Sequence, residues 1–342
     1  MTNSKKVLVT GGAGYIGSHT IVELLSKGLV PIVIDDFSNS NANVFKRIEK
    51  INNKKIDVIT GDIRDVNLLR EIFSKYDIDS VIHFAAKKAV SESEKKPLLY
   101  YSVNVSGTLN LLNIMSEFKV NKLVFSSTAT VYGDTFGKAA KETDPISPIN
   151  VYGKSKFMSE ELIRSLAKVN PDFSAVILRY FNPVGAHPSG LLGEDPNGKP
   201  ENLMPFISQV AVGKIKKLFI FGNDYPTRDG TGARDYIHVT DLAKAHIAAL
   251  EYLSKHQGVD VFNIGTGTNV TVLELLRSFQ EENHVLIPYE IVGRRVGDSA
   301  ICFADVSKAT KILGWKAEKG LLEMCKDTWN WQSLNPNGYI SD

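Results

Sequence analysis

The segment Gly11-Gly12-Ala13-Gly14-Tyr15-Ile16-Gly17 follows the strand-like run Val7-Leu8-Val9-Thr10 and opens a stretch whose apolar residues have helical spacing. Glycines at 11 and 14 let the backbone turn tightly and approach a pyrophosphate, whose charge is stabilised by the amides and dipole of a helix N-terminus. A strand-to-helix turn without a ligand is the alternative, and the placement between strand and helix disfavours it. The segment predicts the first unit of a Rossmann-type α/β fold.

Short apolar runs alternate with longer amphipathic stretches over the first half of the chain. This alternation is typical of a doubly wound parallel sheet, whose strands are buried on both faces. The predicted strands are 7–9, 30–34, 57–59, 81–84, 123–125 and 175–178, and the predicted helices are 15–28, 65–76, 97–119 and 152–169.

Turn residues cluster at Asn182-Pro183, Pro188-Ser189-Gly190 and 195–200, which predicts a long functional loop. Beyond it, Thr240 and Asp241 are expected to open a helix over 241–254, and 262–264 resumes the strand pattern. We expect an NAD-binding Rossmann domain over 1–180. Residues 181–342 are expected to form mainly a smaller α/β substrate-binding lobe, partly interleaved with the first domain.

Composition excludes several classes of function. The 342 residues carry 40 Lys and Arg against 38 Asp and Glu, a formal charge of +2, so nucleic acid is not an expected partner. The polar start of the chain does not resemble a signal peptide, and no apolar run is long enough to span a membrane. Cys302 and Cys325 have no metal or disulfide spacing. The sequence predicts a cytoplasmic protein without a metal or a membrane partner.

Acidic residues end two of the predicted strands. Asp35 lies 18 positions after Gly17, where a carboxylate accepts the adenosine ribose hydroxyls. Asp36 follows, and no arginine lies between 30 and 40, so NAD is predicted rather than NADP. Asp62 is expected either to contact adenine or to cap the helix near 65.

Tyr152 and Lys156 have the i, i+4 spacing that places two side chains on one face of a helix. An ammonium there would favour tyrosinate and lower the pKa of the phenol, which makes Tyr152 a candidate base. Thr128 ends the preceding strand, where its hydroxyl could bind both a substrate hydroxyl and Tyr152. Ser127 is the competing choice for this role.

Together, the glycine motif, Ser127-Thr128 and Tyr152-x-x-x-Lys156 resemble the extended short-chain dehydrogenase/reductase family. Longer peptides resemble its UDP-glucose 4-epimerase branch over nearly the whole chain: 127–133, 179–188, 202–205, 234–239 and 329–332. The resemblance implies that Tyr152 removes the proton of the sugar 4-hydroxyl while a hydride passes from C4 to NAD. The resulting 4-keto sugar then turns over and is reduced on its other face.

The resemblance also implies the sets of binding residues. The predicted cofactor-binding residues are Gly11, Gly14, Tyr15, Ile16, Gly17, Asp35, Asp36, Asn39, Ser40, Asp62, Ile63, Phe84, Ala85, Ala86, Lys88, Asn104, Tyr152, Lys156 and Tyr180. The predicted substrate-binding residues are Lys88, Thr128, Tyr152, Asn182, Asn202, Leu203, Phe219, Phe221, Arg234, Tyr236, Arg295, Asp298 and Cys302. A homodimer through helices near 97–119 and 152–169 is also implied.

Two positions depart from the family pattern. Thr128 stands where many relatives carry Ser, and Val103 stands where many carry the first of two asparagines. Thr128 keeps the hydroxyl, whereas Val103 removes one expected cofactor contact.

Three other functions share parts of this sequence pattern. A nucleotide-sugar 4,6-dehydratase would carry an Asp-Glu pair where this chain has Ala129-Thr130. A uronate epimerase would need an additional cationic contact. A non-catalytic NAD-binding protein could dispense with Tyr152 and Lys156.

Cys302 bears on the breadth of substrates. By the resemblance it lines the sugar pocket near C2, where relatives restricted to plain hexoses carry a bulky Tyr. We expect activity on the N-acetylated UDP-hexoses as well. The alternative is that Cys302 is a small buried apolar residue.

Overall fold

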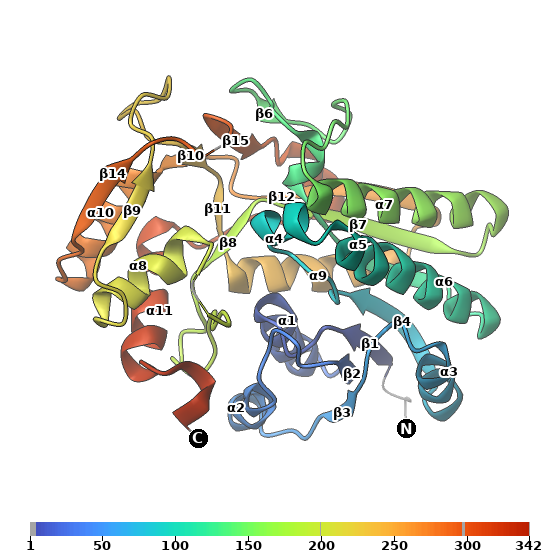
Figure 1. The fold of residues 1–342 in the computed structure, drawn as a ribbon. Helices are drawn as coiled ribbons and strands as arrows, with labels where there is room; N and C mark the ends of the chain where they lie inside the picture. The colour runs from blue at the N-terminus through green and yellow to red at the C-terminus, as the bar shows by residue number, and fades with distance from the viewer. Residues whose placement is uncertain (1–4, 199, 296–297, 342) are drawn as a thin grey trace.

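A seven-stranded parallel sheet forms the centre of the computed structural model, which describes residues 5–198, 200–295 and 298–341. The strand order is β12-β7-β5-β4-β1-β2-β3, so the direction of winding reverses between β1 and β4 (Figure 1). Ligands of open α/β sheets bind at such a reversal. The strands are β1 (Lys6–Thr10), β2 (Val30–Asp35), β3 (Asp57–Thr60), β4 (Ile78–His83), β5 (Lys122–Thr128), β7 (Ser174–Tyr180) and β12 (Val259–Ile264).

Two layers of helices cover the sheet, which confirms the doubly wound prediction (Figure 1). Val7 and Val9 face one layer and Leu8 the other, because successive strand residues point to opposite faces. The first layer contains α1 (Tyr15–Ser26), α2 (Asn43–Asn52) and α9 (Val239–Leu253). The second contains α3 (Val66–Lys75), α6 (Gly107–Glu117) and α7 (Val151–Val169).

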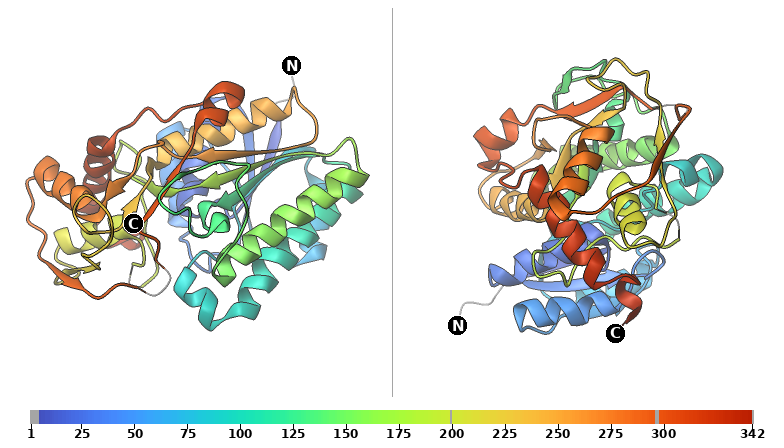
Figure 2. Two further views of the ribbon diagram at one scale, coloured as in Figure 1. Left: turned by 90° about the horizontal axis from the view of Figure 1, so that it is seen from above. Right: turned by 90° about the vertical axis from the view of Figure 1, so that its left-hand side faces the viewer.

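Smaller sheets and helices form a second mass beside the main sheet (Figure 2). Its helices are α8 (Leu203–Ala211), α10 (Val272–Asn283) and α11 (Leu321–Leu334). Its strands pair as β8 (Asn182–Val184) with β11 (Tyr236–His238), as β9 (Leu218–Phe221) with β14 (Tyr289–Val292), and in the order β13 (Val270–Thr271), β10 (Ala233–Arg234), β15 (Ile301–Ala304), β6 (Ala139–Ala140). The two halves of the chain are interleaved. Strand β6, from the first half, joins the four-stranded sheet of the second mass, whereas β12 and α9, from the second half, belong to the large sheet and the helix layer that covers it.

The sequence predicted one continuous α-helix over 97–119, and this prediction is wrong. The stretch is divided into α5 (Pro97–Tyr100), a π-helical segment η1 (Tyr101–Ser106) and α6. Asn104 lies within η1, and its main-chain oxygen accepts hydrogen bonds from the hydroxyls of Thr108 and Ser159. A π-segment shifts the helical register, which aims the buried Asn104 side chain at the loop after β4.

Two helices of the first half of the chain, α2 and α4 (Val90–Lys95), were not predicted, and no ranges were predicted for α8, α10 and α11 of the second half. Apolar residues at helical spacing were present in α2, where Val44, Phe45 and Ile48 are buried. In α4 the six residues are too short for a periodic pattern.

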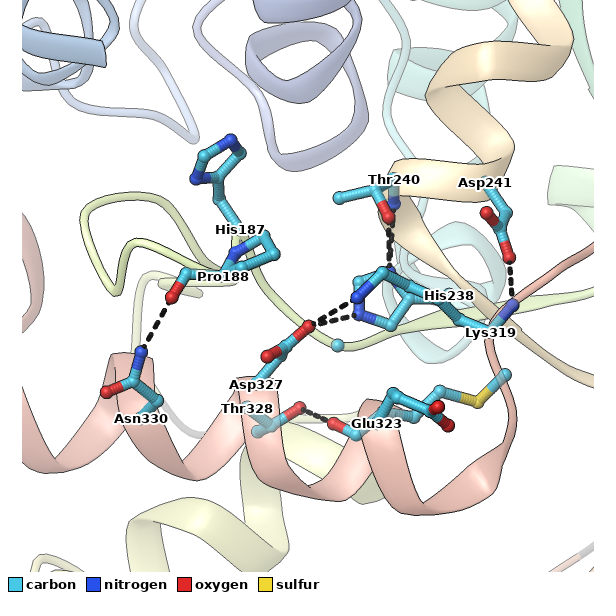
Figure 3. Close-up of polar contacts among 12 residues, drawn as sticks. His187, Pro188, His238, Thr240, Asp241, Lys319, Glu323, Asp327, Thr328 and Asn330 are labelled. Carbon is cyan, nitrogen blue, oxygen red and sulfur yellow. Dashed lines mark hydrogen bonds and ion pairs between the residues drawn. The ribbon is translucent and has the colours of Figure 1, made fainter.

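The helix α9 begins two residues before the predicted start at Asp241, because His238 is its N-cap. The ring Nδ1 of His238 accepts a hydrogen bond from the Thr240 N–H at 3.1 Å, and Nε2 donates to Asp327 Oδ2 at 3.1 Å (Figure 3). Lys319 Nζ pairs with the same carboxylate at 2.9 Å. This buried cluster ties β11 and α9 to α11.

Among the described residues no helix is long and apolar enough to cross a membrane.

Candidate active site

The glycine-rich turn between β1 and α1 leaves no space for side chains. Gly11 has φ +70, and a Cβ there would lie 2.6 Å from the Ala85 nitrogen. A Cβ on Gly17 would lie 2.5 Å from the Gly11 oxygen. Gly14 is the N-cap of α1 and supplies no side-chain hydrogen bond to its first turn. The amides of Tyr15, Ile16 and Gly17 therefore face a position that suits an anion such as a pyrophosphate.

Asp35 lies at the end of β2 beside this turn. Its Oδ2 accepts from the Ala13 N–H at 2.9 Å, and its Oδ1 accepts from Phe37 N–H and Ser40 Oγ, both at 2.9 Å. Burial raises the pKa of the Asp35 carboxyl, and the amide hydrogen bonds oppose that rise. Asp36 accepts from Ser38, and Asn39 lies in the same turn. The carboxylate of Asp35 is thus fixed next to the glycine turn, as an adenosine ribose would require.

Asp62 does not cap α3, which was one of its two predicted roles. Asp65 is the cap, since its carboxylate accepts from the N–H groups of Asn67 and Leu68. Asp62 instead pairs with Arg64, and this ion pair lowers the pKa of the Asp62 carboxyl. The neighbouring Ile63 is buried. Arg64 therefore competes with any ligand for Asp62.

The loop after β4 carries Phe84, Ala85, Ala86 and Lys88. Asn104 fixes the backbone of Lys87 in this loop by accepting from its N–H at 2.8 Å and donating to its C=O at 3.0 Å. Phe84 packs on His246 with ring centroids 4.7 Å apart. The loop lies against the glycine turn, because the Phe84 and Ala85 amides donate to the Thr10 carbonyl.

Three predicted catalytic residues meet above the sheet. The hydroxyl of Thr128, at the end of β5, lies close to that of Tyr152, near the start of α7, and is hydrogen-bonded to the Thr130 hydroxyl at 2.9 Å. Lys156 lies one turn further along α7, with Nζ 4.5 Å from the centre of the Phe125 ring. Ser127, the competing candidate, faces the other way and donates to Glu160 at 2.5 Å. Thr128 and not Ser127 is therefore the hydroxyl beside Tyr152.

Burial dominates the protonation of this group. It raises the pKa of Tyr152 to about 12, and the polar hydroxyl of the nearby Thr128 opposes this rise. It lowers the pKa of Lys156 to about 7, against the charge of Glu160. The expected lowering of the phenol pKa is thus absent in the protein alone, because desolvation outweighs the other influences. A cationic ligand beside the phenol would act in the opposite direction.

Tyr180 ends β7 next to this group. Its hydroxyl is hydrogen-bonded to His246, and burial raises its pKa, which the nearby Ser126 hydroxyl opposes. The predicted cofactor residues of β1, β2, β4, α7 and β7 therefore lie along the carboxyl edge of the large sheet, the expected edge for a dinucleotide.

The predicted substrate residues come from the second mass. Tyr236 on β11 is in register with Asn182 on β8, and Arg234 on β10 is in register with Cys302 on β15. Burial raises the pKa of the Cys302 thiol to about 11. The unpredicted pairing of β10 with β15 places Cys302 beside Arg234, another of the predicted substrate-binding residues.

Arginines and aromatic residues also occur among the predicted substrate-binding residues. Arg295 lies 3.9 Å from the centre of the Phe221 ring, and Phe219 is on the same strand, β9. Arg234 lies 3.8 Å from Asp298. Residues 296 and 297, which lie between Arg295 and Asp298, are outside the described residues.

Glu194 joins residues that sequence reasoning left apart. Its Oε1 pairs with Lys88 Nζ at 3.1 Å and accepts from Asn202 Nδ2 at 3.1 Å. Asn202 is the N-cap of α8, and Leu203 is its first residue. No local pattern pointed to Glu194, because it lies in an irregular loop.

Ser93 and Glu94 of α4 were also missed. Glu94 Oε1 accepts from the Val151 N–H at 2.8 Å, and Ser93 Oγ from the Tyr152 N–H at 3.2 Å. The third amide of α7 is bound by Asn150 at 2.8 Å. Helix α4 thus caps the helix that carries Tyr152, and only the tertiary structure places it there.

No group of His, Cys, Asp and Glu able to hold a metal ion occurs in the part of the chain that the structure describes.

Comparisons with known proteins agree with this geometry. Residues 8–328 match the family model described as GDP-mannose 4,6 dehydratase. A UDP-glucose 4-epimerase of Dictyostelium discoideum is 54% identical over 98% of this chain and 97% of its own length.

Two solved structures are also similar. A UDP-glucose 4-epimerase of Bifidobacterium longum in complex with NAD+ and UDP has a TM-score of 0.95 and 48% identity, over 98% of this chain and 100% of that one. The enzyme of Stenotrophomonas maltophila, with bound NAD and formylated UDP-arabinopyranose, has a TM-score of 0.95 and 47% identity over 97% and 99% of the two chains.

Proposed function

The chain belongs to the family of UDP-glucose 4-epimerases, and from this membership we propose how its residues carry out the reaction. It is an NAD-dependent isomerase that interconverts UDP-glucose and UDP-galactose. The observation that carries the assignment of roles is the position of the Thr128 hydroxyl beside the Tyr152 hydroxyl, with Lys156 one turn away on the same helix.

The glycine turn and Asp35 fit a dinucleotide, since side chains are excluded at 11 and 17 and the first amides of α1 are uncapped. We assign the pyrophosphate to these amides and the adenosine ribose to Asp35. Lys156 and Tyr180 lie where they would contact the nicotinamide half. When bound, NAD accepts the hydride of C4 and returns it.

Tyr152 moves the proton. Its phenolate takes the proton of the sugar 4-hydroxyl, Thr128 orients both oxygens, and Lys156 stabilises the phenolate by its charge. After the 4-keto sugar has turned over and presents the other face of C4, Tyr152 returns the proton to the same oxygen. Because Tyr152 regains its starting state, the chain needs no external acid or base.

We assign binding of the nucleotide to the second mass. Arg234 and Arg295 supply forked donors for the diphosphate, and Asn182, Asn202 and Tyr236 supply polar contacts. The division into a cofactor domain over 1–180 and a mainly substrate-binding lobe over 181–342 follows from this assignment.

A dehydratase is the second candidate, because the matched family model carries that description. Dehydration across C5 and C6 needs a further acid and base. Ala129 and Thr130, which follow the catalytic threonine, supply neither.

We propose that the N-acetylated UDP-hexoses are substrates too. Cys302 is in register with Arg234, which we assign to the diphosphate, and its small side chain would leave space beside the sugar for an acetamido group.

We further propose a homodimer formed through α5, α6 and α7. Large apolar side chains are exposed on these helices, including Leu98 (80% exposed), Leu109 and Met158. The free thiols of Cys302 and Cys325 support a reducing cytoplasmic setting. We also propose that neither nucleic acid nor a membrane is a partner.

The test incubates purified protein with UDP-glucose, UDP-galactose and their N-acetylamino counterparts and separates the products. We expect interconversion within both pairs without consumption of added NAD. Strict dependence on NADP, or a 4-keto-6-deoxy product, would contradict the proposal.

A further inference from the structure

A carboxylate is buried one helical turn beyond Lys156. Glu160 lies on α7 and is fully buried. Its Oε1 accepts from Ser127 Oγ at 2.5 Å and from Arg179 Nε at 3.0 Å, and its Oε2 accepts from Arg179 Nη2 at 2.6 Å. The hydrogen bonds hold the carboxylate in one place.

Arg179 extends this cluster across the sheet. It is a buried residue of β7, and its Nη1 donates to the hydroxyl of Tyr132 at 2.9 Å. The hydroxyl of Tyr132 donates to Asn263 of β12 at 2.7 Å. A buried ion pair seldom adds stability over apolar residues of similar size, so its presence beside the catalytic group calls for another explanation.

Lys156 depends on a nearby negative charge. It is 3% exposed, and burial lowers the pKa of its ammonium to about 7, while the charge of Glu160 opposes that effect. The two side chains are four residues apart on one helix, hence on the same face.

The other groups around this pair do not replace Glu160. His83 of β4 faces Lys156, and burial lowers its pKa to about 3, so it is neutral. Arg179 and Arg164, the latter 3.8 Å away, face Glu160 and are themselves cationic. Tyr152, on the same helix, is neutral while protonated. Among the charged groups found near Lys156 in the described chain, Glu160 is the anion.

We propose that Glu160 is a positioning residue of the epimerase, which keeps Lys156 in its ammonium form and, through Ser127, fixes the strand end that carries Thr128. Arg179 holds the carboxylate in place and compensates for its burial. This inference rests on the proposed role of Lys156.

Removing the carboxylate by Glu160→Gln keeps the size of the side chain and removes its charge. Loss of a negative charge lowers the pKa of every ionisable neighbour, so both limbs of the pH profile of kcat are expected to move to lower pH by about one unit or more. The plateau is expected to fall at least about tenfold, because Glu160 is closer along α7 to Lys156 than to Tyr152, so the pKa of Lys156 falls further and less of the enzyme combines an ammonium with a phenolate. NAD content and KM should stay within about twofold.

The matched control is Glu161→Gln, which removes the same charge from the outer face of α7, where Glu161 is 56% exposed beside Arg164. Its pH profile should coincide with that of the wild type. If Glu160→Gln does not fold, the double variant Glu160→Gln/Arg179→Met removes the whole ion pair and should show a smaller shift in the same direction, because the loss of the Arg179 cation offsets part of the change.

The outcomes separate the two proposals. A wild-type enzyme without epimerase activity, or a fully active Lys156→Met, would refute the proposed function. An active wild type, an inactive Lys156→Met and a folded Glu160 variant with unshifted limbs would overturn this inference alone.

Discussion

The hydroxyl of Thr128 lies beside the hydroxyl of Tyr152 although one residue ends a strand and the other stands in the first turn of a helix. The strand end and the helix are also joined by the bond from Ser127 to Glu160. The geometry of the candidate catalytic group is therefore fixed from both sides.

Tyr152→Phe removes the proton-transfer group and leaves the ring. We expect kcat to fall by about 10²- to 10⁴-fold with NAD still bound. Thr128→Ala should cost about tenfold, the effect of one lost hydrogen bond, and Thr128→Ser should restore most of it. Steady-state kinetics and the NAD content of purified protein check these values. Turnover near wild type in Tyr152→Phe would mean that another residue is the base.

Cys302→Tyr introduces an aromatic ring beside Arg234. We expect loss of turnover of the N-acetylated pair and retention of activity on UDP-glucose and UDP-galactose, because the ring occupies the space for the acetamido group. Product separation for each pair measures the ratio. Cys302→Ser is the size-matched control and should keep both activities. An equal loss on both pairs would place Cys302 outside the sugar pocket.

Ser93→Ala removes the acceptor of the Tyr152 amide. Loss of a helix cap typically costs about 1 kcal/mol, and we expect a lower midpoint of unfolding together with a lower kcat, since Tyr152 is on the first turn of α7. Ser91→Ala, on the same short helix, is the control. A variant with reduced stability and unchanged kcat would show that α4 does not position Tyr152.

The buried pair His238–Asp327 should anchor α11 to the strand that carries Tyr236 (Figure 3). Asp327→Ala leaves His238 and Lys319 without this carboxylate, and we expect a loss of about 1–3 kcal/mol in the free energy of unfolding. The KM for UDP-sugars should rise more than kcat falls. Asn330→Ala, which removes a bond to the Pro188 carbonyl at an exposed site of α11, should change neither by a comparable amount.

Three buried histidines predict how stability depends on pH. Burial lowers the pKa of His19, His83 and His246 to about 3 each, whereas an unfolded histidine titrates near about 6.5. The unfolded state therefore binds more protons as the pH falls below about 6.5. The free energy of unfolding should decrease by up to about 1.4 kcal/mol per pH unit for each histidine until the folded pKa is reached.

Denaturant unfolding of the holoenzyme between pH 7 and pH 5 measures this slope. His256→Asn, at an exposed site, is the control and should leave it unchanged. A stability that is constant over this range would contradict the assignment of neutral buried histidines.

The sequence by itself determined the Rossmann unit and the cofactor, and it predicted the candidate catalytic group. These features rest on local rules: glycines where a Cβ would clash, a carboxylate at a strand end, and a Tyr and a Lys one helical turn apart. Such spacings survive folding because strand and helix geometry fixes them.

The tertiary structure decided which of two adjacent hydroxyls faces Tyr152, what Asp62 binds, and which residues support the site. Ser127 and Thr128 point to opposite faces because strand residues alternate, yet both lie near α7, Ser127 through its bond to Glu160 and Thr128 beside Tyr152. Alternation alone therefore does not tell which hydroxyl lies beside Tyr152. Glu94, Glu194 and Arg179 approach their partners from distant segments, so only packing brings them together. The prediction of one continuous helix over 97–119 was wrong for the same reason. The bonds of Asn104 to Lys87 and Ser159 favour a π-helical segment, which no local periodicity in the sequence indicates.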